Sequence, residues 1–545
     1  MDGLLAFKQG INSDPNGILA SWRSDGHGHE EECCRWRGVR CNNRTGHVVE
    51  LRLEGSSGRI PDFLGPFKNL KYLNLSGIPF TGRVPPQLGN QSKLQYLDIS
   101  GTQSTFSLDL SWLTRLQFLQ YLNLQAVNLS MIANWLHVVN MIPSLKFIDL
   151  SDCLLPSASE HHWSSNLTSL EWLDLSENYF DHQIASCWFW NLTSLKYINL
   201  GFTGMYGQLP PTLGSMISLQ FLDLSYSTLS LPMISLNNIC SLRILNLETS
   251  FLYGNITELI ERLPRCSPCK LQELHLQLNN LTGVLPNSMG HLTSLVVLDL
   301  SGNNITGDVP YEIGVLTDLA YLDLGYNSFD GVITEKHFGF LNNLQFIYLS
   351  YNSLKIELSS EWQPPFRLQH AEFANCKLGP SFPVWLRWMV GIYYLDISDT
   401  GINDRIPLGR NQIFGDLPRD MEMMSVERLY LNSNNLTGRI PPLPQTLTNL
   451  DISVNSLLGP LPLNFGAPKL TELSLFSNRI SGHIPKYICK CKELAILDLA
   501  NNLFEGKLPP CNGMTMLTTL ELSNNSLSGE LPTFCNTQQT CNSLI

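Results

Sequence analysis

The sequence predicts an α/β solenoid of about 20 stacked repeats, and two observations carry this prediction. The motif LxxLxLxxN, often continued by GxIP, recurs along almost the whole chain, as in the segment 470–485. Most successive copies begin 23 to 25 residues apart. Self-similarity at this period and with this motif indicates leucine-rich repeats, each of which buries its apolar face against its neighbours.

The second leucine of LxxLxL, called here the anchor, sets a common register for the repeats. Around it apolar and polar residues alternate with a period of two, which is typical of a strand with one buried face. We therefore expect each repeat to contribute one short strand to a parallel sheet on the concave side. The anchors are Leu51, Leu73, Leu97, Leu122, Ile148, Leu173, Ile198, Leu222, Leu245, Leu274, Leu298, Leu322, Ile347, Ala371, Leu395, Leu429, Leu450, Leu473, Leu497 and Leu520.

An asparagine stands five residues after many of the anchors. Its side-chain amide both donates and accepts, so it can pair backbone groups of two neighbouring turns that would otherwise be buried unpaired. Cys153 and Cys376 fall at the same position, and we predict a structural role for both thiols. The asparagines are Asn178, Asn279, Asn303, Asn327, Asn352, Asn434, Asn455, Asn478, Asn502 and Asn525.

The GxIP element predicts a second short strand in many repeats, because proline is tolerated at a sheet edge but not in a central strand. Extra residues around Cys266 and Cys269 enlarge one repeat, and a single CxxC favours a local disulfide or unpaired thiols over zinc. Cys489 and Cys511 lie in the tails of adjacent repeats and could form a bridge. Near 400–412 about 13 residues of an ordinary repeat are missing, so we expect irregular packing there.

Three segments are expected along the chain: a cap over 1–46, repeats over 47–532, and an unfinished repeat or tail over 533–545. Apolar spacing near the N-terminus predicts two short helices, separated by the turn-forming segment 13–17. The cysteine-rich segment CCRWRGVRC follows at 33–41. Helices held by disulfides would cover the apolar end that the first repeat exposes.

The cap and the repeats together resemble the extracellular part of plant leucine-rich repeat receptor-like proteins, above all those of grasses. DGLLAFKQGI, LASW and CCRWRGVRC are similar to the capping domain of that family, and LGPSFPVWLRW and LDLANNLFEGKLP to its repeats. The resemblance implies a second sheet, a superhelical twist and a disulfide between Cys34 and Cys41. It also implies that Cys33 pairs with a cysteine that would precede this chain.

Composition and charge point to a folded protein of the secretory route. The chain is 43% hydrophobic and 15% charged, and its net charge of −12 argues against nucleic acid and anionic membrane surfaces as partners. Its 14 cysteines and its eleven N-x-S/T sequons favour an oxidising, glycosylating compartment. The sequons are at Asn43, Asn74, Asn90, Asn128, Asn166, Asn191, Asn255, Asn280, Asn304, Asn435 and Asn524.

The beginning of the sequence does not look like a signal peptide. DGLLAFKQGI follows Met1 without a basic segment, a long apolar stretch or a small-residue cleavage site. No run of about 18 uninterrupted apolar residues is present, so we expect no membrane-spanning segment in this chain. We interpret the sequence as a processed or partial form, or as a protein without a targeting signal.

The signatures of catalysis are missing, and we expect neither an enzyme nor a bound cofactor or metal. The sequence has no P-loop, GxSxG, HExxH or kinase motifs. The segment 27–31 and the histidines at 161–162 contain metal-binding residue types but no helical pair of histidines, so surface positions are the better interpretation.

The predicted concave sheet is the better candidate for function. Aromatic residues stand just before the anchor in seven successive repeats, and an acidic-rich column stands just after it. Stacked aromatics also support neighbouring strands, so a structural and a ligand-binding interpretation both stay open. The candidate residues are Tyr72, Tyr96, Tyr121, Phe147, Trp172, Tyr197, Phe221, His275, Tyr348, Glu372, Tyr430 and Phe476.

The resemblance implies a recognition module, extracellular at the plasma membrane or secreted. It would bind a peptide, protein or glycan on its concave face and signal through a partner receptor kinase, in immunity or development. One alternative is a secreted inhibitor of a cell-wall-degrading enzyme, as in the polygalacturonase-inhibiting proteins, although those have about half as many repeats. The other is a truncated binder that does not signal.

Overall fold

The structure, a computed structural model, describes residues 2–9, 11–14, 17–23, 32–53, 57–58, 60, 67–77, 80–101, 104–157, 165–230, 235–380, 383–389, 391–402, 417, 421–511 and 514–529. It divides into two compact units. The N-terminal unit comprises Met1–Gly254 with Glu261–Asn280, and the C-terminal unit comprises Asn255–Ile260 with Leu281–Ile545. Each unit is described by itself. The predicted division into cap, repeats and tail stays a prediction.

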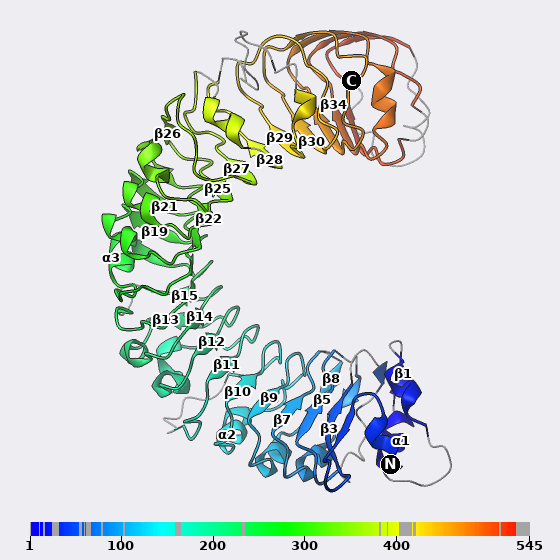
Figure 1. Cartoon of the computed structure of the whole chain (residues 1–545), viewed down its shortest axis with the longest axis vertical. Coiled ribbons are helices and arrows are strands. Elements are labelled where there is room, and N and C mark those ends of the chain that lie inside the picture. The colour runs from blue at the N-terminus through cyan, green and yellow to red at the C-terminus, as the bar shows by residue number, and fades with distance from the viewer. Residues whose placement is uncertain are drawn as a thin grey trace. The chain divides into compact units, whose positions relative to one another are not determined.

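In each unit one parallel sheet, with one short strand per repeat, lines the inner side (Figure 1). The strands align by their anchors, as where Leu173 pairs with Ile198, and the small Ala371 also keeps this register. The register predicted from the sequence is confirmed. The strands of the N-terminal unit are β3 (Val48–Arg52), β5 (Tyr72–Asn74), β7 (Tyr96–Asp98), β9 (Tyr121–Asn123), β10 (Phe147–Asp149), β11 (Trp172–Asp174), β12 (Tyr197–Asn199), β14 (Phe221–Asp223), β16 (Ile244–Asn246) and β18 (Glu273–His275). Those of the C-terminal unit are β20 (Val297–Asp299), β22 (Tyr321–Asp323), β25 (Phe346–Tyr348), β27 (His370–Glu372), β28 (Tyr394–Asp396), β29 (Arg428–Tyr430), β30 (Asn449–Asp451), β32 (Glu472–Ser474), β34 (Ile496–Asp498) and β36 (Thr519–Glu521).

The GxIP segments form a second set of short strands, as predicted. Their glycine takes a left-handed backbone conformation, with φ of 76° at Gly307. A Cβ at Gly307 would lie 2.9 Å from the Val284 side chain of the preceding repeat, so the close stacking of repeats requires glycine. This set contains β6 (Gly82–Arg83), β8 (Thr105–Phe106), β13 (Tyr206–Gly207), β15 (Thr228–Leu229), β17 (Tyr253–Asn255), β19 (Asn280–Gly283), β21 (Asn304–Gly307), β23 (Ser328–Phe329), β24 (Val332–Ile333), β26 (Lys355–Ile356), β31 (Leu458–Gly459), β33 (Arg479–Gly482), β35 (Leu503–Gly506) and β37 (Ser526–Leu527).

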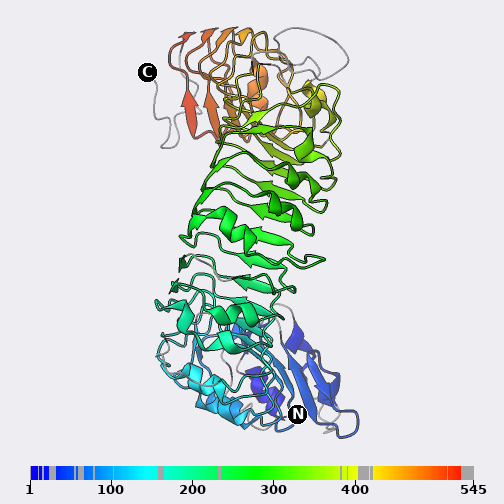
Figure 2. The ribbon, with the colours of Figure 1, turned by 90° about the vertical axis from the view of Figure 1, so that its left-hand side faces the viewer.

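The proline of GxIP begins a 3-10 turn on the outer side of the repeat. Pro310 and Pro485 directly precede η10 (Tyr311–Val315) and η14 (Lys486–Lys490), with φ of −69° and −71°. The pyrrolidine ring holds φ near this value, which prepares the chain for a helical turn. Short helices, among them α2 (Trp135–Asn140) and α3 (Ile256–Glu261), lie on the same outer side (Figure 2).

The asparagines five residues after the anchor form the predicted hydrogen bonds between repeats. The Asn502 amide donates to the Leu475 carbonyl of the preceding repeat at 2.8 Å, and its oxygen accepts from the Ile480 N–H at 3.1 Å. The thiols of Cys153 and Cys376 donate to backbone carbonyls at 3.1 and 3.2 Å. Burial raises the pKa of the Cys376 thiol to about 12, so it stays protonated. The predicted structural role of both cysteines is therefore confirmed.

The cap departs in part from the predicted pair of helices. The first helix forms as α1 (Asp2–Gln9), but strand β1 (Ile11–Ser13) and a 3-10 turn, η1 (Ile18–Ser21), follow in place of a second α-helix. The Asp14 carboxylate accepts from the backbone N–H groups of Ile18 and Leu19 at 2.9 and 2.8 Å, which caps that turn.

A disulfide within the cap fixes the strand that pairs with the first repeat. The Cys34–Cys41 bond implied by the resemblance is present, and Cys33 is buried and lies outside the disulfides of the described residues. Cys41 ends β2 (Val39–Cys41), which runs antiparallel to β3. The backbone groups of the first strand are thereby paired, and the sheet edge that the first repeat would expose is covered.

Two further disulfides join neighbouring repeats. Cys489 bonds Cys511, which confirms the bridge suggested by their positions. Cys266 bonds Cys240, so the prediction of a local bond or unpaired thiols within 266–269 is wrong for Cys266, while Cys269 is buried outside a disulfide. The partners are 22 and 26 residues apart, which is about one repeat, because stacking places equivalent turns of successive repeats side by side.

Some sequence predictions fall partly or wholly outside the described residues. Of the irregular segment 400–412, positions 403–412 are outside them. The segment 27–31, the histidines at 161–162 and the tail 533–545 are wholly outside them. The concave sheet nevertheless passes directly from β28 to β29, where Leu395 pairs with Leu429. Over the part of the chain that the structure describes, no helix is long and apolar enough to span a bilayer.

Candidate functional site

The seven aromatic residues predicted on the N-terminal strands form one continuous stack, called here the stacked column. From Tyr72 to Phe147 the centroids of successive rings lie 4.0 Å apart, with interplanar angles of 10–12°. The next spacings are 5.3, 3.4 and 4.2 Å, and the rings remain nearly parallel. The column consists of Tyr72, Tyr96, Tyr121, Phe147, Trp172, Tyr197 and Phe221, one from each of seven successive strands.

Stacking turns the faces of these rings toward one another. A ring that is covered on both faces offers a ligand only its edge and, in tyrosine, its hydroxyl. The Arg52 guanidinium lies 4.4 Å over the Tyr72 ring and covers the first face of the series. This geometry favours support of the neighbouring strands, and the ligand-binding role of the stacked column stays a prediction.

Amide groups compensate two of the acidic residues beside the stacked column. The Asn199 amide donates to the Asp174 carboxylate at 3.0 Å, and the Asn246 amide donates to Asp223 at 2.8 Å. Asp149 lies on the strand next to Asp174, and its pKa is raised by burial first and also by the charge of Asp174.

The outward aromatic residues of the C-terminal unit form a cluster of a different geometry, called here the tyrosine cluster. Its members are Tyr321, Tyr348, His370, Tyr394 and Tyr430. Three successive ring pairs are 4.7 to 5.4 Å apart and tilted by 41–43°. Only His370 and Tyr394 stack face to face, at 3.9 Å and 9°.

The tilt follows from where the rings stand on their strands. Tyr321, His370 and Tyr394 precede the anchor, whereas Tyr348 and Tyr430 follow it, so in each tilted pair the two rings belong to different columns. Tilted neighbours leave part of each ring face uncovered, and all five side chains are half-buried. The tyrosine cluster thus offers ring faces as well as edges.

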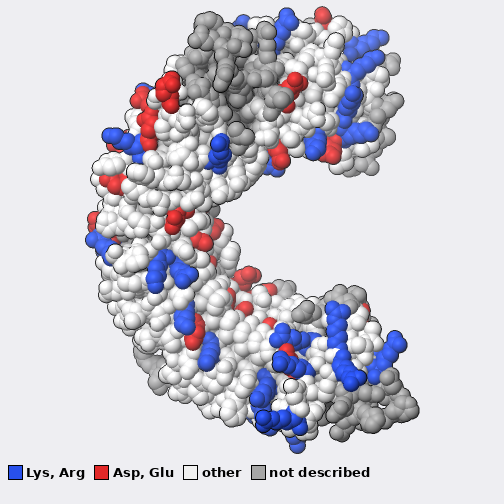
Figure 3. Space-filling model, viewed as in Figure 1, with Lys and Arg blue, Asp and Glu red and all other residues white. Residues whose placement is uncertain are grey.

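Four carboxylates border the tyrosine cluster, those of Asp299, Asp323, Glu372 and Asp396, and we call them the acid group. They stand at the outward position after the anchor in β20, β22, β27 and β28, where no asparagine separates them. Acidic side chains are visible along the inner rim in Figure 3. The His370 Nε2 atom lies 2.7 Å from Glu372 Oε1.

Burial, and next the nearby charge of Asp299, raise the pKa of Asp323 to about 7. A carboxyl whose pKa is raised on folding stabilises the fold fully below its ordinary pKa, and this stabilisation is lost as the pH rises through 7. Asp323→Asn should therefore raise the free energy of unfolding at pH 8 by about 1–2 kcal/mol and leave it little changed at pH 4, after allowance for partial exposure. Urea unfolding at both pH values measures this.

Asp109→Ala is the control of opposite sign, since asparagine at this position would form a sequon with Leu110 and Ser111. Hydrogen bonds from the Ser111 hydroxyl and backbone lower the pKa of Asp109, so this carboxylate stabilises the fold at neutral pH. Asp109→Ala should lower stability at pH 8. A gain of stability in both variants would contradict the electrostatic explanation for Asp323.

The structure brings together only some of the residues predicted from the sequence. Tyr348, Glu372 and Tyr430 meet in or beside the tyrosine cluster. His275 ends β18 in the N-terminal unit, where it pairs with Glu273 at 3.1 Å. Phe476 lies just after β32. The concave strand β30 separates β32 from β29, which carries the last ring of the tyrosine cluster.

Sequence reasoning missed His370 and Arg428. Both stand just before their anchors, where the aromatic column is interrupted, and they are the basic residues at the outward positions of the described concave strands of the C-terminal unit. When the sequence is aligned by its anchors, both residues interrupt a column of aromatic residues. Such an interruption could have identified both as candidates.

The glycosylation sequons leave the concave sheet of the C-terminal unit clear. Of the described concave strands, only β5 carries a sequon asparagine, Asn74, and the strands of the C-terminal unit carry none. Asn74 and Asn128 are half-buried, whereas the other nine sequon asparagines are exposed. Glycans at the exposed positions would not cover the tyrosine cluster.

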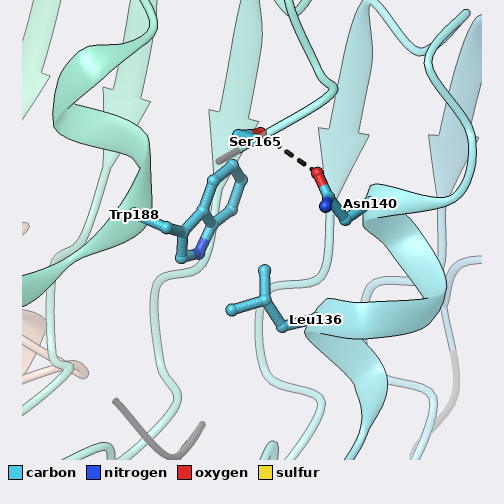
Figure 4. Close-up of a pocket in the computed structure, with 4 residues that line it drawn as sticks. All are labelled: Leu136, Asn140, Ser165 and Trp188. Atoms are coloured by element: carbon cyan, nitrogen blue, oxygen red, sulfur yellow. Dashed lines mark hydrogen bonds between the residues drawn. The ribbon is translucent and has the colours of Figure 1, made fainter. Parts of the chain in front are cut away.

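Other features offer less for a ligand. A hollow on the outer side, lined by Leu136, Asn140, Ser165 and Trp188, has an interior of about 10 Å³ (Figure 4). It holds at most one water molecule. Among the described residues, one group of three metal-ligating side chains comes together, Cys33 with the disulfide-bonded pair of the cap. Neither feature is a candidate site.

Comparison with protein families finds repeats of one type along the chain. A model described as the leucine rich repeat N-terminal domain matches residues 1–42, and a leucine rich repeat model matches 143–205. A second leucine rich repeat model matches 69–91, 270–292, 294–316, 425–447, 469–491 and 516–537.

The curated relatives include two proteins of Solanum lycopersicum, Receptor-like protein EIX1 and Receptor-like protein EIX2. Each is 30% identical to the chain, over 578 and 580 residues respectively. The alignments cover 84% of this chain and 54% of each relative. The chain thus spans about half the length of the curated relatives it matches.

Solved structures with the same architecture include the leucine-rich repeat ectodomain of the Arabidopsis receptor kinase HAESA. In complex with an N-terminally extended IDA peptide hormone it is 26% identical, with a TM-score of 0.75, over 98% of this chain and 87% of that one. The complex of HAESA with IDA and the co-receptor SERK1 is also 26% identical, with a TM-score of 0.71 and the same coverage.

Proposed function

The chain is a leucine-rich repeat protein, homologous to plant receptor-like proteins over most of its length, and on this premise we propose that it recognises a ligand outside the cell. It would be the extracellular recognition part of a receptor-like protein, at the plasma membrane or secreted. The ligand would be a peptide or a protein segment, held on the concave sheet of the C-terminal unit.

The tyrosine cluster is the observation that carries this proposal. Partly uncovered tyrosine rings give large contact areas with little loss of side-chain entropy, and such residues dominate the binding energy of many interfaces. Tyr348, Tyr394 and Tyr430 provide such rings within the four consecutive strands β25, β27, β28 and β29. The clear concave face around them leaves room for an extended segment.

The comparisons support a peptide over other ligands. HAESA, whose ectodomain has the same architecture, is a receptor kinase seen with a peptide hormone and with a co-receptor. Receptor ectodomains of this kind are ligand-binding proteins without catalytic function. We propose by analogy that this chain acts with a partner receptor kinase, in immunity or development.

Binding of peptides from a random twelve-residue library tests the proposal. Tyr394→Ala should weaken the binding of the selected peptides to the secreted chain about 10-fold, because it removes a ring from the centre of the tyrosine cluster. Tyr121→Ala is the matched control, since Tyr121 holds the same outward position in the stacked column.

The two variants separate the possible sites. Loss of affinity with Tyr121→Ala alone would place the ligand on the N-terminal unit. Unchanged affinity in both would refute the concave-face assignment. Each variant is first compared with the unmodified chain by circular dichroism, which shows whether it folds.

A further inference from the structure

We propose that the tyrosine cluster and the acid group bind a lysine or arginine side chain of the ligand. This proposal rests on the proposed function and specifies the chemistry of the ligand at that site. The cationic group would lie between the tyrosine rings and the carboxylates of Asp323 and Glu372.

The first argument is the aromatic surface. A cation is attracted to the face of an aromatic ring within about 6 Å of its centroid, and this attraction needs a face that no other ring covers. Tyr348 is tilted by 41° from Tyr321 and by 43° from His370, so it leaves such a face. The parallel rings of the stacked column have no equivalent.

The second argument is the surplus of negative charge. Burial, and then the charge of Glu372, raise the pKa of Tyr348 and of Tyr394. Glu372 also adds to the raised pKa of Asp323 and Asp396. Burial is the largest cause of each shift, and the charge of Glu372 contributes to all four. The site therefore also carries negative potential, which a cationic side chain would relieve.

The basic residues of the chain itself do not remove this potential. His370 reaches Glu372 at 2.7 Å but is charged only when protonated. Arg428 is exposed beside Tyr394 and lowers the pKa of Tyr394 only as the last of several effects, whereas its effect on Tyr430 follows those of burial and Glu472. In the N-terminal unit Asn199 and Asn246 donate to Asp174 and Asp223. Carboxylates line the concave sheets of both units, and the tilted tyrosine rings beside them single out the C-terminal unit for a cationic side chain.

A pair of charge-removing substitutions tests the inference. Asp323→Asn and Glu372→Gln keep the shapes of both side chains, and neither creates an N-x-S/T sequon. The control is Glu273→Gln in the N-terminal unit, which removes the carboxylate of the other histidine–glutamate pair on a concave strand, that of His275.

The probe is a random twelve-residue peptide library displayed on phage, selected separately on each secreted protein. On the unmodified chain, Lys and Arg together should be enriched about 5-fold over their frequency in the library, since charge-assisted and cation–π contacts act together. The enrichment should vanish with the double variant Asp323→Asn/Glu372→Gln and persist with Glu273→Gln.

The outcomes distinguish this inference from the proposed function. Peptides that lose affinity with Tyr394→Ala but show no cationic enrichment would overturn the inference and leave the proposed function standing. Enrichment that survives the double variant would also overturn it. Peptides indifferent to Tyr394→Ala would instead count against the concave face as the binding site.

Discussion

Replacing Asn178 by alanine should lower the free energy of unfolding of the N-terminal unit by about 4 kcal/mol, since buried backbone groups lose their partners. The Asn178 oxygen accepts from the N–H groups of Cys153 and Leu155 at 3.2 and 2.9 Å. Its amide donates to the carbonyl of Leu150 in the preceding repeat at 2.8 Å. The side chain is fully buried, so water does not replace these bonds in the variant.

The size of the effect follows from the number of groups left unpaired. Each buried donor or acceptor without a partner costs about 1–3 kcal/mol. Alanine leaves several such groups without a partner at one interface between repeats. Because a solenoid is stabilised by contacts between neighbours, loss of one interface should also separate the unfolding of adjacent repeats. Urea unfolding followed by tryptophan fluorescence measures both the midpoint and the cooperativity.

Asn343→Ala is the matched control for this substitution. The Asn343 amide donates to the Thr317 carbonyl at 3.0 Å, but the side chain is exposed. Its loss should cost less than about 0.5 kcal/mol, as at most surface positions. Equal effects at Asn343 and Asn178 would show that burial of the asparagine does not determine its contribution.

The sequence allowed these asparagines to be predicted because repetition fixes both their position and their surroundings. Each anchor pairs with the next anchor, so a residue five positions later meets the same backbone groups in every repeat. The same reasoning extended to Cys153 and Cys376, whose thiols replace the donor side of the amide. What recurs with the period is therefore predictable from one chain.

The features that depart from the period were harder to predict. The sequence treats Tyr121 and Tyr394 alike, since both precede an anchor. Tyr121 is stacked between two parallel rings, whereas Tyr394 is stacked against His370 on one side and tilted against Tyr430 on the other. The difference arises because Tyr348 and Tyr430 stand after their anchors, where most repeats hold Asp or Asn. Side-chain packing between columns decides the geometry, and no single column in the sequence contains that information.

Long-range pairing between repeats gave a second kind of error. The sequence favours a local disulfide or unpaired thiols at Cys266 and Cys269, whereas the partner of Cys266 is Cys240, 26 residues earlier. In a solenoid, residues one repeat apart are nearer in space than many residues a few positions apart. The Cys489–Cys511 bridge, spaced by 22 residues, could be recognised because both cysteines lie in equivalent tails.

Placing a glycan on the concave face of the C-terminal unit should reduce binding of the selected peptides by at least about 100-fold, which corresponds to about 2.7 kcal/mol. Asp396→Asn creates a sequon, because Ile397 and Ser398 follow it. The Ser398 hydroxyl already bonds the Asp396 carboxylate at 2.7 Å, just as the Ser76 hydroxyl bonds the native sequon asparagine Asn74 at 2.7 Å. Asp396 borders the tyrosine cluster, so a glycan there would exclude a bound segment by its volume alone.

Two controls separate the volume of the glycan from its other effects. Asp396→Asn combined with Ser398→Ala retains the amide but cannot be glycosylated, and it should bind the peptides within about 5-fold of the unmodified chain. Asp149→Asn creates a sequon at the equivalent position of β10 in the N-terminal unit, because Leu150 and Ser151 follow it. Mass spectrometry establishes which variants carry the glycan.

A glycan at 149 that blocks binding, while one at 396 does not, would place the ligand beside the stacked column. If the glycan at 396 alone blocks binding, the concave face of the C-terminal unit is the surface that the ligand occupies, whatever part of binding the tyrosines and carboxylates each contribute.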